Sequence, residues 1–216
     1  MTRVKICGVL DDAGVLVGVD YVGLNLWPSS KRYASLEVAR AVAGDSDLGL
    51  APDGARARNP RLVGVFVNPS IDDLANAIEA LPLGVIQLHG DETPEAVADA
   101  ARHTGLPVWK AISIRSAESL DGLDRWPADA LVLDAPVPGR GGAGVTFDWT
   151  LAAAARHRYP DRKIVLAGGL TPDNVAEAIA IVQPWAVDVA SGVETAPGRK
   201  DPAKVAAFVA AVRASR

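Results

Sequence analysis

The sequence has 216 residues and a mass of 22.4 kDa, with 49% hydrophobic and 22% charged residues, which suffices for the core of one domain. The net charge of −4 and the isoelectric point near 5.4 argue against a nucleic-acid or membrane partner. The single cysteine, Cys7, cannot form an internal disulfide, and no apolar stretch predicts a signal peptide or a spanning helix. We therefore expect a cytoplasmic protein.

Short β-branched segments alternate with alanine-rich helical segments along the chain. Strands are predicted at 3–7, 20–27, 62–67, 84–90, 107–113, 130–135, 163–169 and 185–191. Helices are predicted at 71–81, 95–105, 174–182 and 203–213, each preceded by a proline next to a Ser, Thr, Asn or Asp residue. Such residues cap the free N–H groups of a first helical turn, where proline is also tolerated.

This alternation favours a single-domain (β/α)8 TIM barrel spanning residues 1–216 over an open, doubly wound sheet. The polar residues of the strands share one phase, and the alternate positions are aliphatic. They are Lys5, Cys7, Asn25, Gln87, His89, Lys110, Asp134 and Asp188. Both faces of an open sheet covered by helices should be apolar, whereas a barrel can turn polar groups inward.

Two segments depart from the regular alternation. The first crossover, residues 9–18, is too short for a helix of ordinary length, so we expect a shortened first helix. Residues 44–61 are rich in Gly, Asp and Arg, which predicts a long, mobile surface loop.

Glycines at the ends of the last two strands predict a phosphate site. Gly168 and Gly169 precede a helix start in "LAGGLTPDNV", and Ser191 and Gly192 follow the last strand in "VASGVET". Barrels often bind a phosphate between these two loops, through backbone N–H groups and a helix dipole. The alternative is that these glycines only form tight turns.

Cys7 and Asp134 end the first and sixth strands, which lie on opposite sides of the ring. A thiol and a carboxyl across the mouth can act as general base and general acid on different atoms of one substrate. Lys5 lies one layer below Cys7 and would favour its thiolate. The alternative is an inert, buried cysteine.

Other charged residues allow more than one interpretation. We expect Lys5 and Asp188, on neighbouring strands, to form a buried ion pair. Lys110, interpreted as facing inward, is either a Schiff-base lysine or the partner of Asp134 or of substrate oxygens. His89 is either a wall residue or a substrate contact. Three scattered histidines do not predict a metal site.

Two loops above the mouth complete the candidate site. Arg32, in "WPSSKRY", suits a substrate carboxylate, although a solvated loop charge is equally consistent with this position. Gly142 belongs to the glycine-rich "GRGGAGVTFDW", which we expect to order over a ligand and shield Asp134 from water. Our candidates for substrate binding are Arg32, His89, Gly142 and Asp188.

Taken in order, these segments resemble the phosphoribosylanthranilate isomerases of tryptophan biosynthesis. The matching stretches are "VKICG", "YVGLNLWPSSKRY", "VGVFVN", "VIQLHG", "WKAIS", "LDAPVPGRGGAGVTFDW", "LAGGLTPDNV" and "VDVASGVETAPGRKD". They run from residue 4 to residue 201 in the family's order, so the resemblance covers nearly the whole chain.

The resemblance implies a cofactor-free Amadori rearrangement of N-(5'-phosphoribosyl)anthranilate. By the family pattern, Asp134 is the general acid, Cys7 is the general base, and Arg32 contacts the anthranilate carboxylate. The family includes monomers and homodimers, and it has about one more helical turn in the first crossover. A class I aldolase using Lys110 and a non-catalytic barrel that binds phosphorylated ligands are the alternative functions.

Overall fold

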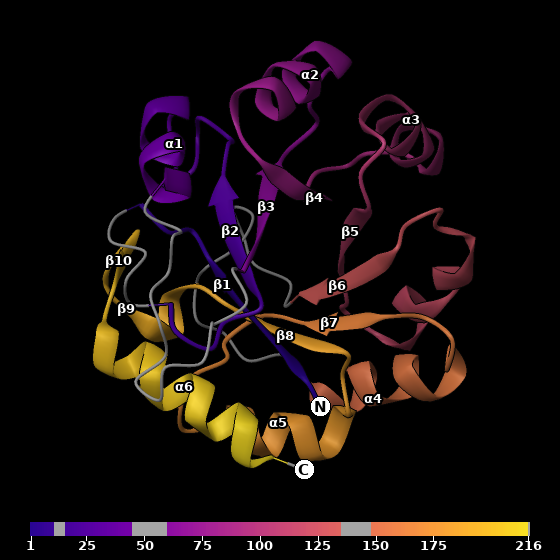
Figure 1. Cartoon of the computed structure of the whole chain (residues 1–216). Helices are drawn as coiled ribbons and strands as arrows, with labels where there is room; N and C mark the ends of the chain where they lie inside the picture. The colour runs from indigo at the N-terminus through magenta and orange to yellow at the C-terminus, as the bar shows by residue number, and fades with distance from the viewer. Residues whose placement is uncertain (11–15, 45–59, 135–147, 216) are drawn as a thin grey trace.

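The computed structural model describes residues 1–10, 16–44, 60–134 and 148–215. Eight parallel strands pair in chain order and close into a barrel surrounded by helices, which confirms the predicted TIM barrel (Figure 1). The strands are β1 Arg3–Cys7, β2 Tyr21–Asn25, β3 Arg61–Phe66, β4 Leu83–Leu88, β5 Val108–Ser113, β6 Ala130–Asp134, β7 Ile164–Leu166 and β8 Ala186–Val189.

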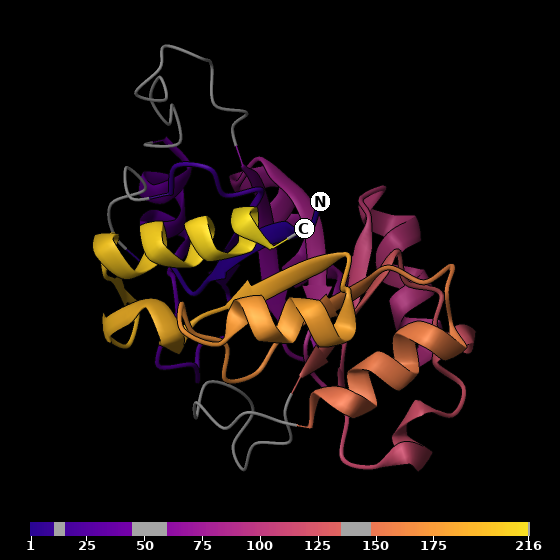
Figure 2. The same cartoon turned by 90° about the horizontal axis from the view of Figure 1, so that it is seen from below.

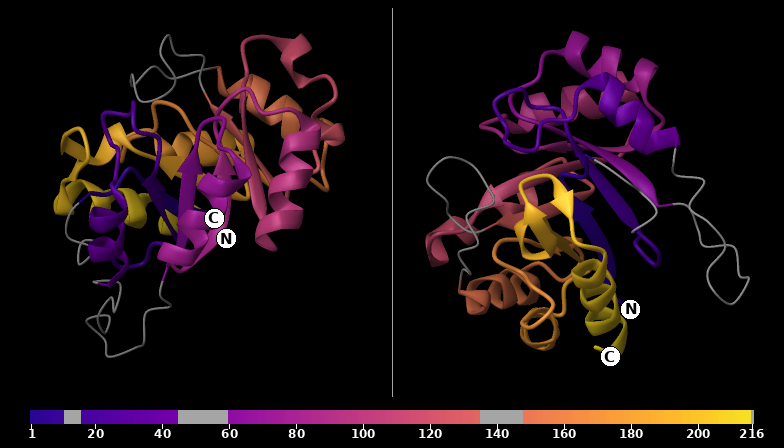
Figure 3. Two further views of the ribbon diagram at one scale, coloured as in Figure 1. Left: turned by 90° about the horizontal axis from the view of Figure 1, so that it is seen from above. Right: turned by 90° about the vertical axis from the view of Figure 1, so that its left-hand side faces the viewer.

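The helices form the outer layer of the barrel. They are α1 Leu36–Gly44, α2 Ile71–Ala80, α3 Pro94–Thr104, α4 Trp149–Arg158, α5 Val175–Val182 and α6 Pro202–Ala214. Helices α4, α5 and α6 follow one another along one side of the barrel (Figure 2), and α1, α2 and α3 cover the opposite side (Figure 3, left). Between β5 and β6 the chain forms only the 3-10 turns η2 Ala117–Leu120 and η3 Leu123–Arg125. None of the helices in the described ranges has the length and hydropathy of a membrane span.

Capping residues explain where the helices begin. Ser70 and Asp73 form a reciprocal capping box at α2, and Thr93 accepts a hydrogen bond from an amide of the first turn of α3. Helix α5 begins after Asn174, whose side chain accepts from the Thr171 amide at 2.8 Å. Thr171 and Pro172 therefore lie in a turn that precedes α5, and the helix itself begins at Val175.

The first crossover lies partly outside the described residues. Its described residues, 9–10 and 16–20, form no helix, and the expected shortening of the first helix stays a prediction. Helix α1 accordingly lies after β2. The predicted surface loop at 44–61 falls mostly outside the described residues. Its first residue, Gly44, ends α1, and its last, Arg61, begins β3.

The closed barrel has two apolar layers. One fills the space between strands and helices, and the other fills the barrel interior with residues such as Val63, Val85 and Val132. At the N-terminal ends of the strands, the rings of Tyr21, Trp109 and Trp185 pack with centroids 4.8–5.9 Å apart. This aromatic cluster closes one end of the interior, so the polar residues gather at the other end.

After β8 the chain forms a small hairpin before α6. The 3-10 turn η4 Ser191–Val193 leads into β9 Glu194–Ala196, which pairs antiparallel with β10 Arg199–Lys200. The hairpin lies beside α6 and faces the side of the barrel that carries α1 (Figure 1 and Figure 3, right). It brings charged residues distant in sequence toward the end of β1.

Candidate active site

The predicted buried ion pair between Lys5 and Asp188 is confirmed. Lys5 pairs with Asp188 across β1 and β8, and the Nζ to Oδ2 distance is 2.7 Å with the lysine side chain fully buried. Burial disfavours the ammonium, but the Asp188 carboxylate outweighs it and raises the pKa of Lys5. A permanent cation therefore lies below Cys7 on the same inward face.

Cys7 ends β1 at the mouth of the barrel and is partly exposed. Burial of the sulfur raises the pKa of the Cys7 thiol, and the charge of Lys5 opposes that rise. The glycines around Cys7 make room for the site. A Cβ on Gly23 of β2 would lie 2.8 Å from the Cys7 sulfur, and one on Gly8 would overlap the side chain of Arg32.

The general-acid candidate Asp134 ends β6 and contacts His89, which follows β4. His89 Nε2 lies 3.4 Å from Asp134 Oδ2, and these side chains are 25% and 14% exposed. The side-chain amide nitrogen of Gln87 lies 3.1 Å from His89 Nδ1, so Gln87 holds the imidazole ring beside Asp134. The structure thus brings His89 and Asp134 together and adds Gln87.

The inward orientation assigned to Lys110 is wrong. Trp109 and Ala111 fill the interior, so Lys110 lies on the outer face of β5. Its ammonium donates to Glu92 Oε2 at 2.9 Å and to the carbonyl oxygens of Gly90 and Ala111. A buried, ion-paired lysine on the outer face of the barrel cannot serve as a Schiff-base nucleophile for a substrate at the mouth.

Arg32 makes a contact that sequence reasoning missed. Its Nε and Nη2 atoms donate to the two carboxylate oxygens of Glu194 at 2.8 and 2.7 Å. Lys200 donates to Glu194 Oε1 at 2.7 Å and to the Cys7 carbonyl oxygen at 2.6 Å. Glu194 and Lys200 both lie in "GVETAPGRKD". The sequence pattern that could have indicated them is a pair of opposite charges six residues apart, with a glycine turn between them.

These contacts set the electrostatics of the hairpin. Burial favours the neutral acid of Glu194, but hydrogen bonds from Arg32 and Lys200 outweigh it and lower the pKa of Glu194. Burial lowers the pKa of Lys200, while Glu194 opposes that change. One carboxylate is shared by two cations, so this group keeps a net positive charge.

The two loops of the expected phosphate site pack against each other. Gly168 and Gly169 have φ angles of 86° and 67°, a left-handed conformation that favours glycine. A Cβ on Gly192 would collide with the carbonyl oxygen of Leu170, so the loops after β7 and β8 approach as closely as their backbones allow. Ser191 begins the 3-10 turn η4 beside them.

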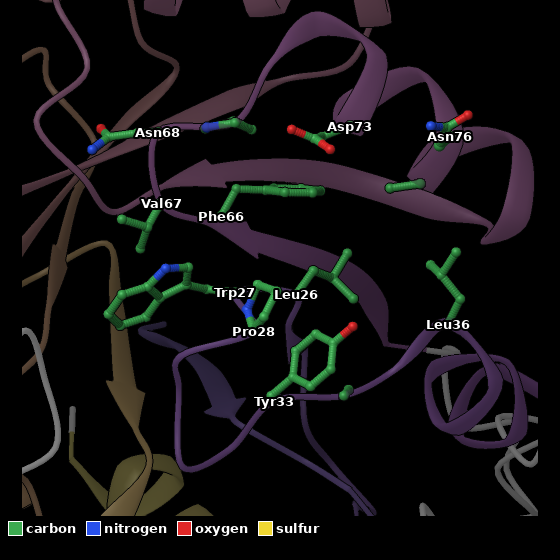
Figure 4. A pocket seen from close by; sticks show the side chains of 13 residues that line it. Leu26, Trp27, Pro28, Tyr33, Leu36, Phe66, Val67, Asn68, Asp73 and Asn76 are labelled. Atoms are coloured by element: carbon green, nitrogen blue, oxygen red, sulfur yellow. The ribbon is translucent and has the colours of Figure 1, made fainter.

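A separate hollow of about 390 Å³ lies outside the mouth, between the loops that follow β2 and β3. Leu26, Phe66 and Tyr33 line it with Trp27 and Asn68 at one side (Figure 4). None of the predicted site residues contributes to it. The predicted substrate contact Gly142 lies outside the described residues, and so does the glycine-rich loop around it.

The mouth thus holds Cys7 and Asp134 on nearly opposite strands, with two glycine loops beside them. The sequence model of the family described as N-(5'phosphoribosyl)anthranilate (PRA) isomerase matches residues 14–211. The chain belongs to this family.

Similar proteins agree with this assignment. The N-(5'-phosphoribosyl)anthranilate isomerase of Ruegeria sp. (strain TM1040) is 43% identical over 222 residues, covering 98% of each chain. The crystal structure of phosphoribosyl anthranilate isomerase from Thermotoga maritima has a TM-score of 0.84 and 36% identity, covering 99% of each chain. As a member of the phosphoribosylanthranilate isomerase family, the chain is an isomerase of tryptophan biosynthesis, and the resemblance deduced from its motifs is confirmed.

Another phosphoribosyl anthranilate isomerase was solved in complex with reduced 1-(o-carboxyphenylamino)-1-deoxyribulose 5-phosphate. It is 34% identical to this chain, with a TM-score of 0.81 and coverage of 99% on both sides. A further structure shows monomers generated from the dimeric Thermotoga maritima enzyme. Our expectation of a monomer or homodimer for this phosphoribosylanthranilate isomerase family member stays a prediction.

Proposed function

We propose that this chain converts N-(5'-phosphoribosyl)anthranilate into 1-(2-carboxyphenylamino)-1-deoxy-D-ribulose 5-phosphate by an Amadori rearrangement. Asp134 acts as the general acid and Cys7 as the general base. The observation that carries the proposal is their placement on the inward face of β6 and β1, at the same end of a barrel whose other end is closed by aromatic rings. The proposed reaction needs no cofactor.

In the first step, protonated Asp134 gives its proton to the furanose ring oxygen. The bond between C1 and that oxygen breaks, and the anthranilate nitrogen forms an iminium with C1. His89, held by Gln87, contacts the carboxyl oxygen of Asp134 and orients it. Held in this way, Asp134 is positioned to give the proton that general acid catalysis requires.

In the second step, the Cys7 thiolate removes the C2 proton. The electrons of that C–H bond form the C1–C2 double bond, and those of the iminium return to nitrogen, giving an enolamine that tautomerises to the ketone. The raised pKa of Cys7 disfavours the thiolate in the free protein. The positive charge of the iminium acts in the opposite direction and favours the thiolate, whose proton passes to solvent.

The ends of the substrate have matching partners. We place the phosphate between Gly168–Gly169 and Ser191–Gly192. Among the described residues, the amides of Gly169, Ser191 and Gly192 donate to no backbone carbonyl, so these N–H groups can donate to phosphate oxygens. Arg32 binds the anthranilate carboxylate through Nη1, because Glu194 occupies its Nε and Nη2 edge. Asp188 Oδ1 has no partner in the described part of the chain and can accept from a sugar hydroxyl.

The experiment compares Cys7→Ser and Asp134→Asn with the unmodified enzyme. Substrate fluorescence follows turnover, and the reduced product measures binding. Loss of turnover in both variants, with binding kept, supports the proposal, whereas full activity in either variant overturns the mechanism. Complementation of a tryptophan auxotroph that lacks this step tests the reaction itself, and binding without turnover in the unmodified protein would indicate a non-catalytic barrel.

A further inference from the structure

Lys200 is a buried charge that the mechanism above does not use. Its side chain is only 2% exposed, although it stands on the short hairpin strand β10 outside the barrel. The three hydrogens of its ammonium have three acceptors, which are the carbonyl oxygens of Cys7 and Ala190 and the carboxylate of Glu194, at 2.6, 3.3 and 2.7 Å. The shortest of these contacts is with the backbone of the candidate base.

A lysine at this position is costly as a packing residue. Burying an ammonium is unfavourable unless it is paired and fully hydrogen bonded, and a neutral side chain would fill the same space without that cost. Two of the acceptors, moreover, lie at the ends of β1 and β8, the neighbouring strands that carry Cys7 and Asp188. The contacts therefore tie together the strand ends that hold the site.

We propose that Lys200 is a positioning residue of this active site, which fixes the end of β1 through the Cys7 carbonyl and whose charge favours the Cys7 thiolate. The catalytic consequence rests on the proposed function, in which Cys7 is the base. Lys200 contacts no reacting atom itself and acts through Cys7.

The charges that face Cys7 come from four elements. Lys5 lies below it on β1, and Asp188 faces it from β8. Arg32 faces it from the loop after β2, and Lys200, which is paired with Glu194 of β9, faces it from β10. The carboxylate of Asp188 partly offsets the charge of Lys5, and the ammonium of Lys200 adds to the positive charge that faces Cys7. The positive charge of Lys200 opposes the rise in the pKa of Cys7 that burial causes.

The test measures the pH dependence of Cys7 alkylation by iodoacetamide, which is specific because Cys7 is the only cysteine. In Lys200→Met, the midpoint should move upward by about one pH unit, as expected for the loss of a nearby opposite charge. The acid limb of kcat/KM should move with it, so that kcat/KM at pH 7 falls about tenfold. Lys200→Arg keeps the charge and should restore most of the loss.

Lys204→Met is the matched control. Lys204 is exposed and donates to the carbonyl oxygen of Glu194 at 3.0 Å, and it has no contact with Cys7. In Lys204→Met, the alkylation midpoint of Cys7 should equal that of the unmodified protein. An unshifted midpoint in folded Lys200→Met would overturn the inference. A shifted midpoint with unchanged turnover would support the positioning role and overturn the proposed role of Cys7 as base.

Glu194→Gln gives a test of opposite sign, which also applies if Lys200→Met does not fold. Removing the carboxylate leaves the positive charges of Lys200 and Arg32 without their counter-ion. The alkylation midpoint of Cys7 should then move downward. A midpoint that rises or stays constant in this variant would contradict the proposed electrostatic role of Lys200.

Discussion

The α-carbon of Gly23 on β2 faces the sulfur of Cys7 on β1, and a Cβ at position 23 would lie 2.8 Å from that sulfur. Carbon and sulfur do not approach so closely without displacing one another. The space for the proposed base is therefore made by the absence of a side chain on the neighbouring strand.

The first prediction concerns this space. Gly23→Ala should displace the Cys7 thiol and lower kcat/KM by at least about tenfold, while overpacking costs roughly 1–3 kcal/mol of stability. The measurements are steady-state kinetics and urea unfolding. Gly84→Ala on β4 is the control, because its Cβ would stay at least 3.5 Å from its neighbours. Equal activity of the two alanine variants would contradict the argument.

A second prediction addresses the loops after β7 and β8. Gly192→Ala would drive a Cβ into the carbonyl oxygen of Leu170 and separate the two loops. Because we place the phosphate between these loops, KM should rise strongly and inhibition by inorganic phosphate should weaken, with a smaller change in kcat. Gly44→Ala, where a Cβ meets nothing within 4 Å, should leave all three quantities unchanged. Unaltered phosphate inhibition in Gly192→Ala would contradict the placement of the phosphate between these loops.

A third prediction concerns the buried pair of Lys5 and Asp188. Asp188→Asn leaves an uncompensated ammonium inside the barrel and should lower the free energy of unfolding by about 3–5 kcal/mol. The double variant Lys5→Met/Asp188→Leu, which replaces both charges by apolar groups, should be more stable than Asp188→Asn. Urea unfolding at pH 7 measures both. If Asp188→Asn is more stable than the double variant, Asp188 is not what stabilises the buried ammonium of Lys5.

The fourth prediction follows from the lowered pKa of Glu194. Unfolding returns this group to its ordinary pKa of about 4.3, so in acid the unfolded chain binds a proton that the folded chain does not. Its stabilising contribution is present above pH 4.3 and is lost as the pH falls through the folded pKa. Between about pH 5 and pH 3, the unfolding free energy of Glu194→Gln should fall less steeply than that of the unmodified protein. Parallel curves would show that Glu194 is not held as a carboxylate.

The sequence predicted most of the architecture because period-2 and helical patterns are local. All eight strands lie within the predicted segments to within a residue, and Cys7 and Asp134 end their strands as expected. The orientation of Lys110 was wrong for a physical reason. Its strand carries apolar residues on both faces, so its phase is fixed only by which neighbours fill the interior, and those are Trp109 and Ala111.

The sequence by itself determined the barrel, the family and the strand ends at which the proposed acid, base and phosphate loops stand, because each follows from local periodicity and short motifs. Only the tertiary structure decided which partners these groups have. Glu194 and Lys200 are far from Arg32 and Cys7 along the chain, and a hairpin folded back over the barrel brings them together. Long, charged side chains reach acceptors on other elements, and no local pattern encodes that reach.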